Sequence, residues 1–231
     1  MERRRMLQGL ALCLVLCVAG CATYTPRVVG IPETAGPGVS TRVQEHLTLS
    51  VEAYASAEKS KSVFDTDLAD KGIIPLLVTV QNAGQEPYQV HSTDFVLRDG
   101  DTVLQMLSPE EASRKAKRDA VGRAVGWSLI VPIIGIPIAA TSSVLHTNKV
   151  NKSIVQDFTA KAFKDGGLKL HEKRSGFLFF ALPKGQKALN VPRLDLTATN
   201  LATHDQVTLT TSLPAAGFAA KNEESAAPPA Q

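Results

Sequence analysis

The chain has 231 residues, 44% of them apolar and 20% charged, and its formal net charge is +3. This length allows one sizeable domain or two small ones, and the composition is that of a globular protein rather than a disordered, collagenous or polytopic one. Residues 1–20 have the character of a removable segment and carry Arg3, Arg4 and Arg5 against Glu2, so 22 basic and 21 acidic residues remain without them. That balance argues against a globally basic nucleic-acid-binding protein, and no nucleic-acid partner is expected.

The amino terminus has the layout of an export signal. After the three arginines, residues 10–19 form an uncharged apolar stretch, which suits a signal peptide and is too short to span a bilayer. The stretch runs into Val18-Ala19-Gly20-Cys21. This sequence resembles the lipobox of bacterial lipoprotein precursors, an aliphatic residue and two small residues before a cysteine. The resemblance implies cleavage after residue 20 and a diacylglycerol on the sulfur of Cys21.

The same resemblance indicates where the protein goes. Ala22 after the lipidated cysteine, in place of Asp, implies the outer membrane of a Gram-negative cell, with the protein facing the periplasm. Two or three acyl chains give stable anchoring, whereas a single chain is marginal. Because Cys13 and Cys17 lie in the removed segment, the mature protein has no free thiol for catalysis, for a disulfide or for a metal site.

Stretches without a regular pattern flank the expected domain. Residues 21–41 contain prolines and glycines at close intervals and predict a flexible tether. Residues 214–231 are rich in alanine and proline and predict a disordered tail. The folded domain is therefore expected over 42–213.

Short strands dominate the domain. Residues 47–53 alternate between apolar and polar with period two. Residues 73–80 are more densely apolar and predict a central strand, with Pro75 near its start or at an edge. A turn is expected after it at 82–84. Arg98-Asp99-Gly100-Asp101 lies between apolar runs and predicts a hairpin, with a type I′ turn that has positive φ at both central residues.

Further strands are expected near the end of the domain. Residues 177–182 form another dense apolar run, and the alternating stretches 194–198 and 207–211 predict a final hairpin across 200–205. Seven or eight short strands with turns between them are typical of a sandwich rather than of a βαβ fold. Over about 42–106 and 166–212, the pattern resembles the small immunoglobulin-like domains of bacterial envelope lipoproteins.

The stretch between the two strand-rich blocks begins with a helix signal. Ser108 at the N-cap, Pro109 at N1 and Glu111 at N3 make a capping box, so a helix is expected through Arg118. Residues 114–123 carry five basic side chains and one acidic side chain, a local charge of +4. This run is either a solvated face or a contact for anionic lipid headgroups.

An uncharged run of 22 residues follows, at 124–145, and is called here the apolar run. As a helix it would reach about 33 Å, close to the thickness of a hydrocarbon core. Each large aliphatic side chain gains ~1.5–3 kcal/mol on burial, so leaving the run in water would cost on the order of 10 kcal/mol. A second amphipathic helix is expected after it, with Val150, Ile154, Phe158 and Phe163 near helical spacing.

Three ways of covering the apolar run stay open. A continuous transmembrane helix is opposed by Pro132 and Pro137, each costing about 3 kcal/mol inside a helix. A hairpin turning near these prolines is favoured, and it would dip into the membrane or pack against a partner subunit. The third way is burial in the core of the same domain. The residues expected to make the membrane or partner contact are Trp127, Leu129, Ile130, Val131, Ile133, Ile134, Ile136 and Ile138.

The sequence contains no recognisable catalytic or cofactor motif. Its five histidines never fall at metal-ligand spacing, and no nucleophile elbow, phosphate loop or dinucleotide-binding fingerprint occurs. Asp65, Asp67 and Asp70 lack the central glycine and distal glutamate of a calcium loop, so a solvated loop is expected there. We therefore expect neither an enzyme nor a bound metal or cofactor.

These observations predict a mainly β protein: an immunoglobulin-like antiparallel sandwich with an inserted helix, apolar hairpin and helix at about 108–165. The expected function is that of a lipid-anchored cell-envelope protein with a structural or adaptor role. Its expected partners are the membrane, through the lipid on Cys21, and an envelope protein or a second copy of the chain. The alternative is a periplasmic module that binds a lipid or another apolar ligand, with residues 124–145 as a lid or cavity wall.

Overall fold

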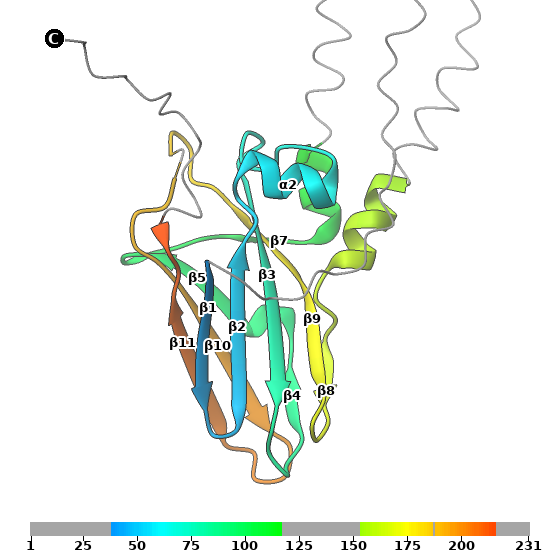
Figure 1. Ribbon diagram of the computed structural model, residues 1–231, viewed down its shortest axis with the longest axis vertical. Coiled ribbons are helices and arrows are strands. Elements are labelled where there is room, and N and C mark those ends of the chain that lie inside the picture. Colours follow the sequence, from blue (N-terminus) through cyan, green and yellow to red (C-terminus); the bar gives the residue numbers. More distant parts are fainter. Residues whose placement is uncertain (1–37, 117–152, 187, 216–231) are drawn as a thin grey trace, which may run out of the picture.

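The computed structural model describes residues 38–116, 153–186 and 188–215 (Figure 1). The described part is mainly β, as predicted. Its strands are β1 (Val39–Gln44), β2 (Leu47–Ala53), β3 (Ile73–Asn82), β4 (Tyr88–Val90), β5 (Phe95–Asp99), β6 (Thr102–Val103), β7 (Met106–Leu107), β8 (Gly166–Leu168), β9 (Lys173–Ala181), β10 (Pro192–Asn200) and β11 (Gln206–Ser212). Helix α2 (Ala57–Phe64), the 3₁₀ turn η2 (Ser92–Asp94) and the helical residues 109–116 and 153–161 complete it.

The strands form two antiparallel sheets that pack face to face (Figure 1). The first sheet has the order β1-β2-β3-β9-β7. In the second sheet, β10 pairs with β11 along one edge and with β5 and then β4 along the other. Strands β6 and β8 add to this second sheet beside β5 and β4. The result is a two-layer sandwich.

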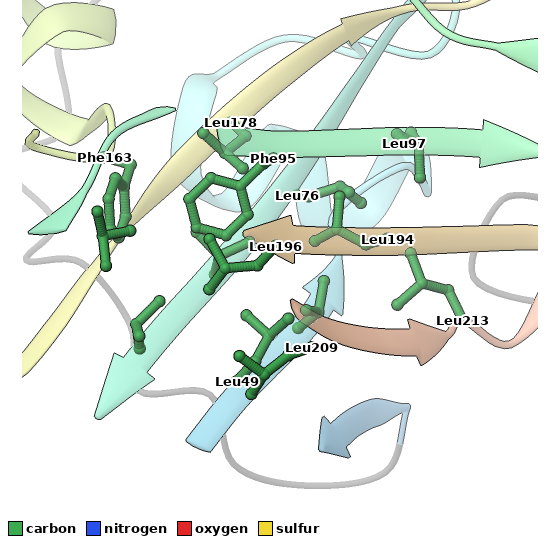
Figure 2. Close-up of a cluster of buried hydrophobic side chains, with 14 of the residues drawn as sticks. Leu49, Leu76, Phe95, Leu97, Phe163, Leu178, Leu194, Leu196, Leu209 and Leu213 are labelled. Carbon is green, nitrogen blue, oxygen red and sulfur yellow. The ribbon is translucent and has the colours of Figure 1, made fainter. Parts of the chain in front are cut away.

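Aliphatic side chains fill the space between the two sheets, here called the inner core. Figure 2 shows Leu49 and Leu76 of the first sheet meeting Leu196 and Leu209 of the second, and all four are fully buried. Burial of such a side chain is worth about 1.5–3 kcal/mol. In β10 and β11, the period-two sequence pattern therefore corresponds to the alternation between the inner core and solvent.

The central strands of the first sheet are buried on both faces. Along β3, Ile74 and Leu76 point into the inner core, whereas Ile73 and Leu77 belong to a second buried cluster on the opposite face. Helix α2 and the helical residues 109–116 and 153–161 supply the other side of this second cluster, here called the outer core. Double burial explains why residues 73–80 are almost continuously apolar.

Most of the expected strands are present. Strands β2, β3, β5, β6, β9, β10 and β11 include or overlap the predicted runs, and β10 and β11 form the predicted final hairpin. Pro75 is the third residue of β3 and lies next to the point where β2 ends, as expected. The sequence did not reveal β4, β7, β8 or helix α2. Strand β1 begins at Val39, inside the stretch assigned to the tether.

The tight turns of two hairpins contain residues with positive φ. In the β5–β6 hairpin, Gly100 has φ +58, whereas Asp101 is not among the residues with positive φ. The hairpin is confirmed, but the expected type I′ turn is wrong, because only the first central residue is left-handed, as in a type II′ turn. The β1–β2 turn has positive φ at both Glu45 and His46, the type I′ pattern, without a glycine.

The sandwich has two distinct ends. One end, here called the loop end, is made of the turns at 45–46, 83–87, 169–172 and 201–205. Backbone hydrogen bonds tie these turns together: the amide of Ala83 donates to His46, that of Asn82 to Glu172 and that of Leu201 to Pro87. The opposite end carries helix α2 and is here called the helical end (Figure 1).

Candidate functional site

The expected contact residues lie outside the described residues. This applies to Cys21 and to the whole contact set, which consists of Trp127, Leu129, Ile130, Val131, Ile133, Ile134, Ile136 and Ile138. The two stretches that lead into and out of the apolar run are described, up to residue 116 and from residue 153. Together with the strands they pack on, these stretches form the base of the insertion, which is the candidate site.

The first stretch is fixed by the predicted capping box. The amide of Ser108 donates to the Glu111 carboxylate at 2.9 Å, and the amide of Glu111 donates to the Ser108 hydroxyl at 3.2 Å. These hydrogen bonds from Ser108 lower the pKa of Glu111 below its ordinary value. Further along, Ala112 is fully buried in the outer core, and the Lys115 ammonium donates to the carbonyl of Gly72 at 2.6 Å. The start of the insertion is thereby tied to the beginning of β3.

The second stretch is held by a buried ion pair. Lys161 and Asp157 are one helical turn apart, 2.6 Å from nitrogen to oxygen, with side chains only 5% and 8% exposed. The same ammonium donates to the carbonyl of Val63 at 2.7 Å and lies 5.3 Å from the ring centre of Phe64. Val63 and Phe64 close the last turn of α2, where free carbonyls attract cations. Lys161 therefore joins the returning stretch to α2.

Helix α2 supplies the centre of the outer core. Its N-cap is Ser56, whose side chain accepts a hydrogen bond from the amide of Lys59, and it ends at Asp65 in a left-handed conformation. Phe64 is fully buried, and its ring centre lies 5.0 Å from that of Phe158 and 4.9 Å from that of Phe177. Aromatic pairs at such separations add about 0.5–1.5 kcal/mol beyond their buried area.

The returning chain then crosses β9 in direct backbone contact. The amide of Phe163 donates to the carbonyl of Phe177 at 3.0 Å, and Ala162 forms a parallel bridge with the same residue. A Cβ placed on Gly176 would lie only 2.3 Å from the Cα of Phe163. Only glycine permits this approach, because no side chain atom fits in the gap.

Phe163 enters the inner core rather than the outer one. Its ring lies edge-on to Phe95, with 5.2 Å between the ring centres (Figure 2). The expectation that Phe163 continues the helical face is wrong, because the helix ends at residue 161. Phe158 and Ile154 do lie on that helix and pack in the outer core as expected, whereas Val150 lies outside the described residues.

A shallow depression of about 520 Å³ lies beside this crossing. Its walls come from β7 and β9 of the first sheet, from the turn η2 and from the two stretches of the insertion base, and include Met106, Leu107, Pro109, Ala162 and Phe163. On its rim, the amide of Ser92 donates to the Asp165 carboxylate at 2.6 Å. No sequence pattern indicates this depression, since its walls come from segments that are far apart along the chain.

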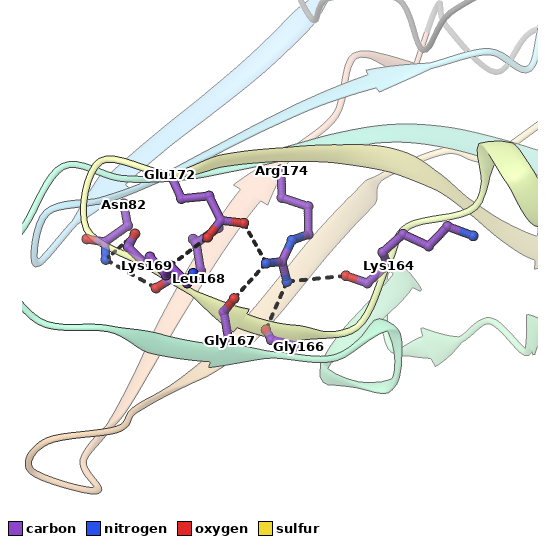
Figure 3. A network of polar contacts seen from close by, with 8 residues as sticks. All are labelled: Asn82, Lys164, Gly166, Gly167, Leu168, Lys169, Glu172 and Arg174. Carbon is purple, nitrogen blue, oxygen red and sulfur yellow. Dashed lines mark hydrogen bonds and ion pairs between the residues drawn. The ribbon is translucent and has the colours of Figure 1, made fainter.

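Polar contacts secure the chain as it leaves the insertion for the loop end. The Arg174 guanidinium donates to the carbonyls of Gly166 at 2.9 Å and Gly167 at 2.6 Å, and pairs with Glu172 at 2.6 Å (Figure 3). A hydrogen bond from the backbone of Lys169 and then the contact with Arg174 lower the pKa of Glu172. These contacts hold β8 and the turn after it against β9.

Tyr54 covers the outer core at the edge formed by β2. Its ring lies 5.1 Å from that of Phe177, edge to face. Burial, and to a lesser extent the negative charge of Glu52, raise the pKa of Tyr54 to about 12. Glu52 is itself paired with Lys59 at 2.6 Å. This group stabilises the attachment of α2 to the sheet.

The described residues contain no group of three or more His, Cys, Asp or Glu side chains arranged to hold a metal ion. In the same part of the chain, no helix has both the length and the apolar character needed to cross a membrane. Asp65, Asp67 and Asp70 lie in and after the end of α2, where the amide of Asp70 donates to Asp67 at 3.1 Å.

Comparison with solved structures finds distant likenesses. A functionally unknown protein from Listeria monocytogenes EGD-e matches over 83% of this chain and 97% of its own, with 12% identity and a TM-score of 0.34. A likeness this distant carries no argument about fold or function. No protein-family model and no curated protein matches the chain.

Proposed function

We propose that this protein is a lipid-anchored cell-envelope protein with a structural or adaptor role. In this proposal Cys21 carries the lipid, the protein faces the periplasm from the outer membrane, and a sandwich domain holds the apolar run against the membrane or a partner subunit. The contact residues are those named above, from Trp127 to Ile138. The proposal assigns the protein no catalytic activity.

The finer fold proposal is an immunoglobulin-like sandwich, and the strand order supports it. In such domains one sheet has the order A-B-E-D and the other contains C-F-G. With β2 as strand A, the first sheet reads β2-β3-β9-β7, which is A-B-E-D in chain order. Strands β5, β10 and β11 then take the places of C, F and G. On this assignment the insertion lies in the connection between strands D and E.

The attachment of the insertion is the observation that carries the functional proposal. Both of its described stretches are fixed to the body of the domain. The first is bonded through Lys115 to Gly72 at the start of β3, and the second is bonded through Lys161 to α2 and lies against β9 at Gly176. A loop that merely connected two strands would not need an aromatic core of its own. Such a base supports an insertion that presents a surface to something outside the domain.

The test compares three forms of the mature protein, all with Cys21→Ser to remove the lipid. One is otherwise unchanged, one has residues 122–147 replaced by a Gly/Ser linker, and one keeps the length but has the seven large aliphatic contact residues changed to serine. We expect only the first to float with liposomes or to oligomerise in solution. Both replacements leave the described stretches intact, so circular dichroism should report a folded domain in all three.

Two results would overturn the proposal. If the unchanged form is a monomer that does not bind liposomes while the linker form unfolds, the apolar run belongs to the core of the domain. If the full precursor takes up no radiolabelled palmitate in cells, or keeps residues 1–20, the anchoring fails. Robust turnover in a broad hydrolase screen would contradict the absence of catalysis.

A second candidate function is a periplasmic module for a lipid or another apolar ligand. The depression beside the insertion base favours it, because about 520 Å³ falls within the usual range of ligand pockets and several of its walls are apolar. Mass spectrometry of an organic extract of the purified protein separates the two functions. The Met106→Trp variant would fill the depression. If the unchanged protein carries a stoichiometric lipid and this variant does not, the result supports the ligand module.

A further inference from the structure

We infer that the helical end of the sandwich faces the lipid bilayer and that the loop end points away from it. This inference rests on the proposed lipid anchoring and on the membrane as the contact of the apolar run, and it adds an orientation to them. The inference is carried by the places where the chain leaves the described structure and by the lengths of chain available beyond them.

The chain leaves the described structure at the helical end. Val39, the first residue of β1, pairs with Glu52 at the end of β2 next to α2. The helical residues 109–116 are tied to Gly72, at the start of β3, by Lys115. The returning helix starts at residue 153 beside α2 and reaches the sheet at its other end (Figure 1). The tether and both connections to the apolar run therefore start from the same end.

The length of chain between the described residues and the apolar run limits how far the run can lie from the helical end. The apolar run begins eight residues after residue 116 and ends eight residues before residue 153. Eight extended residues reach at most about 28 Å. Strand β3 has ten residues and so spans about 33 Å, roughly the length of the sandwich. The whole apolar run thus cannot enter a bilayer beyond the loop end, whereas it can enter one beyond the helical end.

The tether alone would not set the orientation. Cys21 lies 17 residues before Gly38, so an extended tether reaches about 60 Å, enough to permit either end to face the membrane. The insertion is the shorter connection, and it is therefore the one that orients the domain.

The surfaces of the sandwich agree with an end-on arrangement. The outward face of β10 and β11 is polar, with Thr197 and Thr199 on one strand and Thr208 and Thr210 on the other. Such a face offers no apolar side chain to a bilayer. At the helical end, Val191 is 68% exposed in the loop after β9. Its carbonyl accepts a hydrogen bond from the amide of Gly100 in the β5–β6 turn. Exposed Leu201 lies at the loop end, so the orientation is decided by chain connections and not by apolar exposure.

The test places one label at each end of the full lipoprotein. Gln186 is exposed in the loop that follows β9, and Ala202 is exposed in a turn of the loop end. Gln186→Cys and Ala202→Cys each give the mature protein a single free thiol, because Cys21 is acylated in the proposal. Each variant carries a fluorophore in vesicles of phosphatidylethanolamine and phosphatidylglycerol that contain a headgroup nitroxide quencher.

Because the two ends are about 33 Å apart, the label at 186 should be quenched at least about twofold more than the label at 202. Equal quenching, or stronger quenching at 202, overturns the orientation. Replacing residues 122–147 with the Gly/Ser linker should abolish most of the difference, and a persistent difference would show that the insertion does not orient the domain. Measurements are made on the vesicle-bound fraction after flotation. Failure to float overturns the anchoring itself, whereas flotation with reversed quenching overturns the orientation alone.

Discussion

The inner and outer cores of this protein are built by different means. The inner core is aliphatic and comes from alternating strand residues such as Leu49 and Leu209, so it follows from the pairing of the sheets. The outer core is aromatic, and Phe64, Phe158 and Phe177 reach it from a helix, the returning stretch and a strand. The comparison teaches that the sandwich and the attachment of the insertion are stabilised by largely separate sets of contacts, with Phe163 as the residue of the returning chain that enters the inner core. Changes in one core should therefore be distinguishable from changes in the other.

The largest expected effect comes from the point where the two cores meet. Gly176→Ala would put a methyl group 2.3 Å from the Cα of Phe163, so the backbone must move. We expect a loss of about 5 kcal/mol or more in the free energy of unfolding, measured by urea denaturation. The matched control is Gly167→Ala, where the nearest atoms are 3.8 and 3.9 Å away. Similar stability for both variants would contradict the close approach.

Phe64→Ala tests the independence of the outer core. Removing the ring at its centre should cost about 4 kcal/mol, since Phe to Ala changes in cores typically cost 3–5 kcal/mol. Hydrogen exchange should rise first in residues 109–116 and 153–161, while β10 and β11 stay protected. Leu209→Ala, in the inner core, is the comparison, and it should raise exchange in β10 and β11. Uniform exchange in both variants would mean that the two cores unfold as one.

A smaller effect is expected from the buried ion pair. Lys161→Met leaves the Asp157 carboxylate without its ammonium in a buried setting and should cost about 3 kcal/mol. The double variant with Asp157→Leu should recover most of that loss, because a well-packed apolar pair replaces the charges. Thermal unfolding of the single and double variants measures both effects. A double variant no more stable than the single one would contradict the ion pair as the source.

The smallest effect concerns pH and the capping box. The pKa of Glu111 is lowered in the folded protein, so the ionised carboxylate adds stability at pH values above 4.5, the ordinary pKa of the group. That contribution is lost as the pH falls through the lowered folded value. Wild type should therefore be more stable than Glu111→Gln at pH 7, and the difference should vanish in strong acid. Urea denaturation at pH 7 and pH 3 checks this, and a pH-independent difference would count against the carboxylate.

The fold was more predictable from the sequence than the insertion base. Period-two alternation gave β2, β10 and β11 because each has one face in the inner core and the other in solvent. The capping box was predictable because all its contacts lie within four residues. Helix α2 was missed, although Ser56 at its N-cap and the helix formers after it were a usable signal.

Other features of the insertion base depend on contacts that no local pattern encodes. Gly176 lies inside β9, between the polar residues 173–175 and the apolar residues 177–181. A glycine inside a strand indicates a close backbone approach but does not identify the partner. Phe163 continues the spacing of Ile154 and Phe158, and only the end of the helix at residue 161 sends it to the other core. From the sequence alone, Lys161 would be interpreted as a surface lysine, because the carbonyl that it contacts, that of Val63, is 98 residues away.

The neighbours Ala162 and Phe163 belong to different cores, the first to the outer and the second to the inner. A pulling force on the insertion therefore does not simply peel a helix from the surface of the sheet. The force must also pull the Phe163 ring out of the inner core, where it packs against Phe95. Detaching the insertion therefore requires contacts in both cores to break at the same point.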